Sequence, residues 1–172
     1  FNLRELGPEI TGGLILYKLE DTEKVLSFYN EYISTAPREV TTVLVYRYCP
    51  PAPFIKEEFH GKPIFAIGAL YAGKTDKGLE VLKPIKQFGS PIGDAIVPKP
   101  FITHQAMLDA GQPKGACYYW KSEYLKEVSP VLSSKFVEQT LNMSSKSSII
   151  AAFQLGGAIT DVSEEDTAYS YE

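Results

Sequence analysis

The feature that most limits the folds open to this chain is a pair of β-rich segments separated by a proline-rich loop. Thr41–Cys49 (TTVLVYRYC) and Pro63–Gly73 are both dense in β-branched and aromatic residues, which favour strands. The prolines between residues 50 and 53 end the first segment, because proline cannot donate to a sheet ladder. We therefore expect two strands that run antiparallel to each other as neighbours in one sheet.

Helix and strand signals alternate on both sides of this pair. Gly12-Gly13 leads into Leu-Ile-Leu-Tyr, a short apolar run typical of a buried strand. Asp21 is placed to cap a helix that Pro37 ends, with an apolar stripe formed by Val25, Leu26, Tyr29, Tyr32 and Ile33. Three further helices are expected: one from Thr75 or Asp76 that Pro84 bends or shortens, one at Pro100–Ala110 stopped at Gly111, and one starting at Ser129-Pro130. Three further strands are expected: a weak one at Pro91–Val97, a strong aromatic one at Cys117–Leu125, and a long one at Ser147–Thr160 interrupted at Gly156-Gly157.

The resulting order, β-α-β-β-α-β-α-β-α-β, predicts an α+β fold. We expect an antiparallel sheet with helices packed on one face, beginning with ferredoxin-like βαββαβ elements. At 172 residues, the chain is long enough for one domain with a substantial core, so residues 1–172 are predicted to form a single domain.

Composition excludes several kinds of partner. A net charge of −4 without a cluster of Lys and Arg argues against a nucleic-acid or anionic-membrane surface. The longest apolar stretches, Ile64–Tyr71 and Ile149–Phe153, are strand-sized and too short to span a membrane. Cys49 and Cys117 stand in no metal-ligand pattern, so we expect two buried thiols, with one disulfide as the alternative.

The two ends favour an excised piece of a longer protein. Phe1 is not an initiator, and residues 1–6 alternate apolar and polar like a strand already under way. Residues 167–172 stop without a helix cap or a polar tail. No targeting motif marks a compartment, and we favour the cytoplasm only slightly.

Several short motifs, in this order and at these spacings, resemble one protein family. They are Gly12–Tyr17 (GGLILY), Phe28–Ile33 with Ala36-Pro37, His60–Pro63 (HGKP), Tyr71–Gly73, Leu108–Ala110, Tyr118–Ser122 (YYWKS) and Leu155–Ala158 (LGGA). Together they resemble the substrate domain of berberine bridge enzyme-like FAD-linked oxidases, in the vanillyl-alcohol oxidase group of flavoproteins. The resemblance covers nearly the whole chain, and YYWKS followed by LGGA is its most specific part.

The resemblance implies a two-domain oxidase whose substrate-binding (cap) part is this chain. A flavin-binding domain of the same polypeptide would hold FAD, often covalently, and this domain would lay its sheet over the flavin ring and shape a small-molecule pocket. Members of the family oxidise alcohols, sugars or alkaloid-type carbons by hydride transfer to flavin. Many relatives have an aromatic residue followed by His-Arg where this chain reads Tyr169–Glu172 (YSYE), and no phosphate-cradling glycine loop is expected. This fragment alone should therefore not bind FAD tightly.

Two candidate substrate-binding residues come from the YYWKS segment. Strand alternation would place Tyr119 and Lys121 on one sheet face. By the resemblance, both line the pocket near the flavin, where Lys121 would hydrogen-bond substrate or stabilise negative charge on an alkoxide or the reduced flavin. From the residues alone, a solvent-facing lysine on a half-exposed sheet is the simpler interpretation. An excised domain should leave this face partly exposed and apolar.

Phe153, Gln154 and Arg47 complete the substrate-binding candidates. Phe153 falls where relatives carry a Tyr or His that faces substrate, and a phenylalanine would act there through shape or stacking. Gln154 points the other way on a regular strand, although a bulge at Gly156 would rotate either residue. Arg47 could reach a substrate across the sheet. Each of the three is also consistent with an ordinary sheet residue, and no catalytic residue is nominated.

The two histidines titrate near neutrality but have no ligand pattern around them. We expect His60 to position its loop and His104 to lie on a helix surface, and a metal site has no support. The competing interpretation of the whole chain is a stand-alone ferredoxin-like module without flavin, which binds a small ligand or dimerises through an exposed sheet face. A flavin-binding sequence encoded upstream of Phe1 would decide for the oxidase.

Overall fold

The structure is a computed structural model that describes residues 6–166, and it has the predicted α+β fold. The expectations for residues 1–5 and for Tyr169–Glu172 lie outside the described residues. The helices are α1 (Thr22–Thr35), α2 (Thr75–Gln87), α3 (Phe101–Gln105) and α4 (Pro130–Leu141). The strands are β1 (Glu9–Lys18), β2 (Val40–Tyr48), β3 (Pro63–Tyr71), β4 (Gly93–Asp94), β5 (Val97–Pro100) and β6 (Ile149–Phe153).

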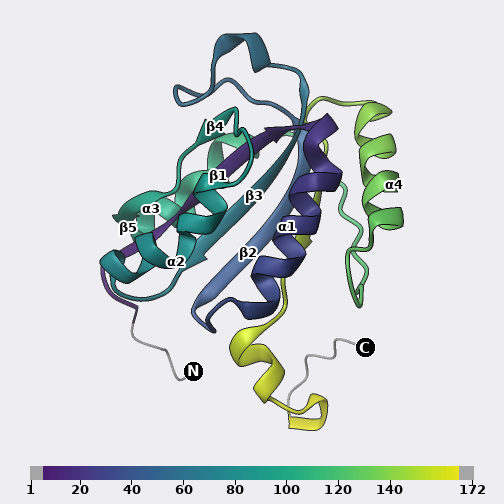
Figure 1. The fold of residues 1–172 in the computed structure, drawn as a ribbon. Coiled ribbons are helices and arrows are strands. Elements are labelled where there is room, and N and C mark those ends of the chain that lie inside the picture. Colours follow the sequence, from purple (N-terminus) through teal and green to yellow (C-terminus); the bar gives the residue numbers. More distant parts are fainter. Residues whose placement is uncertain (1–5, 167–172) are drawn as a thin grey trace.

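The strands form one antiparallel sheet in the order β4-β1-β3-β2-β6, with β5 also paired to β1 (Figure 1). The predicted pairing of β2 with β3 is confirmed, with register from Val40 opposite Tyr71 to Tyr48 opposite Pro63. Strands β1 to β4, together with α1 and α2, have the ferredoxin-like arrangement. In the sheet, β1 lies between β4 and β3, and β2 lies on the other side of β3. β6 extends this sheet past β2.

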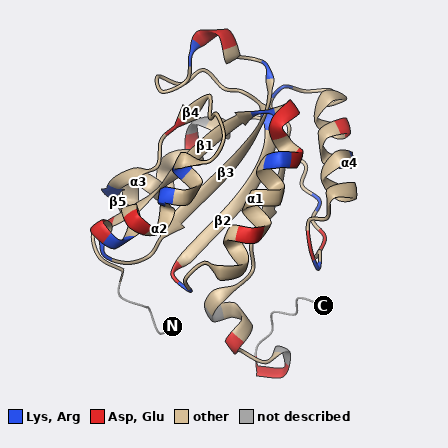
Figure 2. Ribbon diagram, in the orientation of Figure 1, with Lys and Arg blue, Asp and Glu red and all other residues tan. Residues whose placement is uncertain are grey.

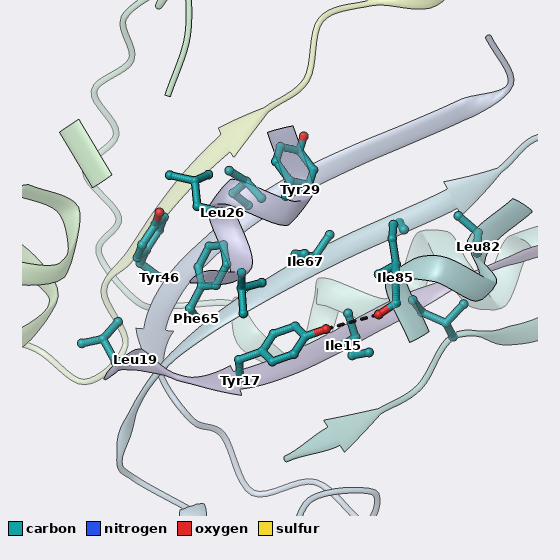
Figure 3. Close-up of a cluster of buried hydrophobic side chains, with 14 of the residues drawn as sticks. Ile15, Tyr17, Leu19, Leu26, Tyr29, Tyr46, Phe65, Ile67, Leu82 and Ile85 are labelled. Carbon is teal, nitrogen blue, oxygen red and sulfur yellow. Dashed lines mark hydrogen bonds between the residues drawn. The ribbon is translucent and has the colours of Figure 1, made fainter. Parts of the chain in front are cut away.

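The three long helices cover one face of the sheet and enclose the main core. Apolar residues of α1 and α2 pack there on alternate residues of β1, β2 and β3 (Figure 3). Phe136 and Val137 of α4 pack against the same cluster. The Tyr17 hydroxyl donates to the Ile85 carbonyl at 3.2 Å and to the Phe88 carbonyl at 3.2 Å, which ties β1 to the end of α2. Burial, with a smaller contribution from Asp94, raises the pKa of Tyr17 to about 12, so this phenol stays a hydrogen-bond donor.

The opposite face of the sheet, here called the second face, carries the other set of alternating strand residues. Leu16, Val45 and Ile64 form a smaller core there with Cys49 and with Ile55, which comes from the proline-rich loop. The short helix α3 also lies on this face. Its His104 ring approaches Gly12 of β1, and a Cβ at Gly12 would meet the His104 Cε1 atom at 3.2 Å.

The predicted strand at Cys117–Leu125 is wrong. Residues 112–129 form no helix or strand, and residues 111–127 are all exposed. The segment pairs with no strand of the described sheet, in which β2 lies between β3 and β6 and β1 pairs with β3, β4 and β5. Aromatic residues favour strands by packing on a half-buried pleated surface, and the exposed side chains of this segment pack on none. The alternation expected to set Tyr119 and Lys121 on one sheet face therefore does not exist.

Three other elements differ from expectation in extent. The single strand expected at Pro91–Val97 is replaced by β4 and β5, and the helix expected at Pro100–Ala110 is α3 followed by the 3-10 helix η3 (Ala106–Gly111). The strand expected at Ser147–Thr160 is only β6, followed by the 3-10 helix η4 (Gly157–Asp161). Gly157 adopts a φ of +61°, a left-handed conformation that turns the chain away from the sheet.

The long helices begin close to where they were predicted. Ser129 caps α4, since its side chain accepts a hydrogen bond from the Leu132 backbone N–H at 3.3 Å. Asp21 occupies the N-cap position of α1 but makes no side-chain capping bond; the Thr22 hydroxyl instead donates to the Leu19 carbonyl at 2.6 Å. Pro84 lies inside α2, which continues to Gln87. Cys49 is a buried free thiol as expected, whereas Cys117 is free but exposed.

Candidate functional site

The second face carries two of the five predicted site residues. In the β2–β6 register, Phe153 lies opposite Val43 and Arg47 lies opposite Ile149, so Phe153 and Arg47 point to the same side. Phe153 is 66% exposed and Arg47 is half-buried. Four residues of extended strand separate their positions, which corresponds to about 13 Å along the sheet.

The other three predicted residues lie elsewhere. Tyr119 is 90% exposed and Lys121 is exposed, both in the irregular segment before α4. In the described part of the chain, neither has a hydrogen bond or ion pair to Arg47 or Phe153. Gln154 is exposed just after β6, and its backbone N–H donates to the Thr42 carbonyl at 3.1 Å. Its position is therefore held by the sheet although its side chain faces solvent.

Arg47 is a cation in an apolar setting. Along β2 its neighbours on the same face are Val45 and Cys49, and on the adjacent strands they are Ile64 and Ile149. Its Nε donates to the backbone carbonyl of the adjacent Tyr48 at 3.2 Å. Burial lowers the pKa of Arg47, and the Cys49 thiol opposes this shift. Burial also raises the pKa of the Cys49 thiol, and the positive charge of Arg47 opposes this rise.

The second face also holds a histidine that was expected on a helix surface and not at a site. His104 is half-buried, and its Nδ1 is fully buried without a hydrogen-bond partner among the described residues. Burial and then the positive charge of Lys99 lower the pKa of His104. The expectation of a helix-surface histidine is therefore wrong, because α3 packs on β1 at Gly12. A glycine inside a strand often marks such a close approach, and Gly12 was the available signal.

Charge is unevenly distributed between the two sides of the sheet. Figure 2 shows that most of the sheet is uncharged and that charges of both signs lie on α1 and α2. By register, the charged strand residues on the second face are Lys18, Arg47 and Lys99, all basic. Asp94 lies opposite Ile15 and thus on the helix-covered side. In a chain of net charge −4, this sheet face is locally basic.

A separate cleft lies on the helix side of the molecule. It has a volume of about 450 Å³ between α1 and α4, and polar side chains such as Ser27, Asn30 and Ser133 line it with Leu26 and Val137. None of the predicted substrate-binding residues borders it. The cleft and the second face are therefore distinct features of the fold.

One segment matches the sequence motif of a phosphate-binding loop but does not form such a loop. Gly68–Thr75 reads GALYAGKT, which fits the pattern G-x-x-x-x-G-K-T. The structure places Gly68–Tyr71 within β3, so only Ala72–Lys74 connect this strand to α2. A phosphate-cradling loop needs the intervening residues to leave the strand and wrap around the ligand. This segment therefore does not fit the phosphates of FAD.

Comparison with known proteins gives a partial match. No protein-family model matches the chain. An FAD-linked oxidoreductase from Dictyostelium discoideum is 28% identical over 102 residues, which cover 57% of this chain and 22% of that protein. The chain has a distant relative among the FAD-linked oxidoreductases. This match supports a general link to FAD-linked oxidoreductases, and the aligned region spans only about a fifth of the relative.

Two kinds of feature are absent from residues 6–166. No helix within residues 6–166 combines the length and apolar character needed to cross a membrane. No set of three or more His, Cys, Asp and Glu side chains in that range is grouped closely enough to hold a metal ion.

Proposed function

We propose that residues 1–172 are the substrate-binding domain of an FAD-dependent oxidoreductase that oxidises an alcohol, sugar or related small molecule by hydride transfer to flavin. The observation that carries the proposal is the second face, which is apolar, basic at its charged positions and exposed at Phe153. Leu16, Val45 and Ile64 on this face are buried within the domain, so the part of the face suited to lie over a planar ring and an uncharged substrate carbon is its exposed edge at Phe153. The partial match to an FAD-linked oxidoreductase favours a flavin as that ring.

The distribution of exposed apolar side chains supports a flavin-binding domain as partner. Except for Phe54, Leu79 and Val97, the exposed large apolar residues all lie at or beyond Ile102. Trp120, for example, is 63% exposed. Extensive exposed apolar surface is typical of a region that another protein body covers. We propose that the flavin-binding domain of the same polypeptide covers this half of the chain.

In this arrangement the domain positions the substrate. The flavin, when bound by its own domain, supplies the hydride acceptor. Phe153 packs against the substrate, and the sheet behind it keeps water from the reacting carbon. The segment before α4 packs on the flavin-binding domain, which brings Tyr119 and Lys121 to the edge of the pocket. Gln154 lies at the mouth of the pocket, after the end of β6.

The test is the visible spectrum of the protein expressed from its complete gene, recorded before and after denaturation. We expect the absorbance of oxidised flavin in the native protein. Colour that stays with the denatured polypeptide would indicate covalent attachment. A colourless protein that does not take up added FAD would refute the proposal and favour the stand-alone binding module.

A further inference from the structure

We propose that the cleft between α1 and α4 binds a small neutral polyol, of the size of a single saccharide unit. Its volume of about 450 Å³ lies within the usual range of small-molecule sites. Figure 1 shows α1 and α4 side by side on the helix-covered side of the sheet. A molecule in the cleft is therefore separated from Phe153 by the sheet, and this second site does not depend on the proposed oxidation.

The first argument is the floor of the cleft, which combines apolar side chains with a buried hydroxyl. Leu19, Leu26 and Ser133 line the cleft and are buried. The hydroxyl of Ser133 shares a hydrogen bond with that of Tyr46 at 3.0 Å, whereas a serine hydroxyl can take part in up to three. The floor therefore offers a surface for the C–H groups of a ligand and a hydroxyl that can bond one of its oxygens.

The second argument is the rim of the cleft, to which both helices contribute hydrogen-bonding side chains. Ser27 and Asn30 of α1 and Ser134 of α4 line the cleft and are exposed. The amide supplies two donors and an acceptor, and a serine hydroxyl can donate and accept. The Ser134 hydroxyl donates to the Pro130 carbonyl at 3.0 Å, so its lone pairs are left to accept from a ligand. The hydroxyl groups of a polyol likewise donate and accept, and they match this mixed set.

The charges around the cleft favour a neutral ligand. Glu20 and Glu23 line it and disfavour an anion. Glu20, however, forms an ion pair with Lys18 at 3.4 Å, and Glu23 lies in the first turn of α1, where the helix N-terminus contributes about half a positive charge. This compensation leaves little attraction for a cation. None of the described lining residues is aromatic, so a flat aromatic ligand would find no ring to stack on.

The experiment measures ligand binding by saturation-transfer NMR on the protein expressed from its complete gene. Glucose is the polyol probe, and cyclohexanol, a six-membered ring with a single hydroxyl, is the comparison ligand. Two additional hydrogen bonds of ordinary strength should make glucose bind about tenfold more tightly than cyclohexanol. Failure of the wild type to bind glucose, or to prefer it, would overturn the proposal.

Two substitutions at the rim locate the bound glucose. Asn30→Ala should weaken glucose binding about fivefold, because it removes about one neutral hydrogen bond, and the double variant Ser27→Ala/Asn30→Ala should weaken it further. Both side chains are exposed, so thermal unfolding should show a stability close to that of the wild type. Glucose binding that is unchanged in the double variant would place the sugar elsewhere and overturn the assignment to the cleft.

Gln139→Ala is the matched control. Gln139 is an exposed amide of α4 that does not border the cleft, so its replacement should leave glucose binding unchanged. An equal loss in Gln139→Ala and Asn30→Ala would indicate a general effect of removing an amide and would overturn the assignment.

A diamine tests the neutral character of the ligand. 1,4-Diaminobutane should bind no more tightly than glucose, because the carboxylates at the rim are already partly compensated. Tighter binding of the diamine that Glu23→Gln abolishes would make the cleft a cation site and overturn the polyol.

These readouts do not depend on flavin. A colourless protein that binds glucose through Asn30 would keep the polyol site and refute only the oxidase. A flavoprotein whose glucose binding is indifferent to the double variant would keep the oxidase and refute only the polyol site.

Discussion

The hydroxyl oxygens of Tyr46 in β2 and Ser133 in α4 lie 3.0 Å apart in the buried interior, although 87 residues separate them in sequence. The Phe136 ring meets the Tyr46 ring edge-on, with 5.4 Å between ring centroids. Burial raises the pKa of Tyr46, and the hydrogen bond with Ser133 opposes that shift. This polar contact and its aromatic neighbour hold α4 against the sheet, next to the strand that carries Arg47.

Removing either hydroxyl should therefore destabilise the fold. We expect Tyr46→Phe and Ser133→Ala each to lower the free energy of unfolding by about 1–2 kcal/mol, because each leaves a buried hydroxyl unpaired or loses a buried contact. The double variant should lose less than the sum of the two single losses. Urea denaturation of the four proteins measures this coupling. Strict additivity would mean that the two hydroxyls do not interact.

Replacing Gly13 by alanine should be severely destabilising. A Cβ at Gly13 would lie in hard contact with the Ala95 carbonyl oxygen, where the chain between β4 and β5 runs beside β1, and backbone atoms cannot move aside easily. The φ of +154° at Gly13 adds strain for any other residue. We expect a loss of about 2–4 kcal/mol by urea denaturation.

Gly111→Ala is the matched control for this change. The nearest atom to a Cβ at Gly111 is the Arg47 Nη1 at 3.8 Å, an ordinary contact. The control should stay within about 1 kcal/mol of the wild type. Equal effects of the two substitutions would contradict a close approach at Gly13.

The stability of the protein should depend on pH through His104. Its pKa is lowered in the folded protein, first by burial and then by Lys99, whereas the unfolded chain has the ordinary value of 6.5. As the pH falls through 6.5, the unfolded state takes up a proton before the folded state does, so stability falls. Above about pH 7.5 both states are neutral at this residue, and the contribution no longer changes.

His104→Leu should remove this part of the pH dependence. The difference in unfolding free energy between variant and wild type should be constant above about pH 7.5 and should shift in favour of the variant as the pH falls toward about 5.5. Urea denaturation across this range measures it. A difference that stays constant over the whole range would show that His104 keeps its ordinary pKa in the fold.

Local sequence patterns by themselves determined the long helices and the central strands. α1, α2 and α4 follow from apolar spacing and end signals, and the pairing of β2 with β3 follows from strand propensity on either side of the prolines. These features depend on residues that are close in the chain, so they can be recognised without knowing the fold.

Only the tertiary structure decided which segments joined the sheet and which side chains met. The aromatic residues of Cys117–Leu125 had the propensity for a strand, but the segment pairs with no strand of the described sheet and its side chains are exposed. Arg47 and Phe153 share a face because of the β2–β6 register, and His104 reaches the sheet because Gly12 leaves room for it. Strand pairing and close packing are contacts between distant parts of the chain, and the composition of a single segment does not specify its partner.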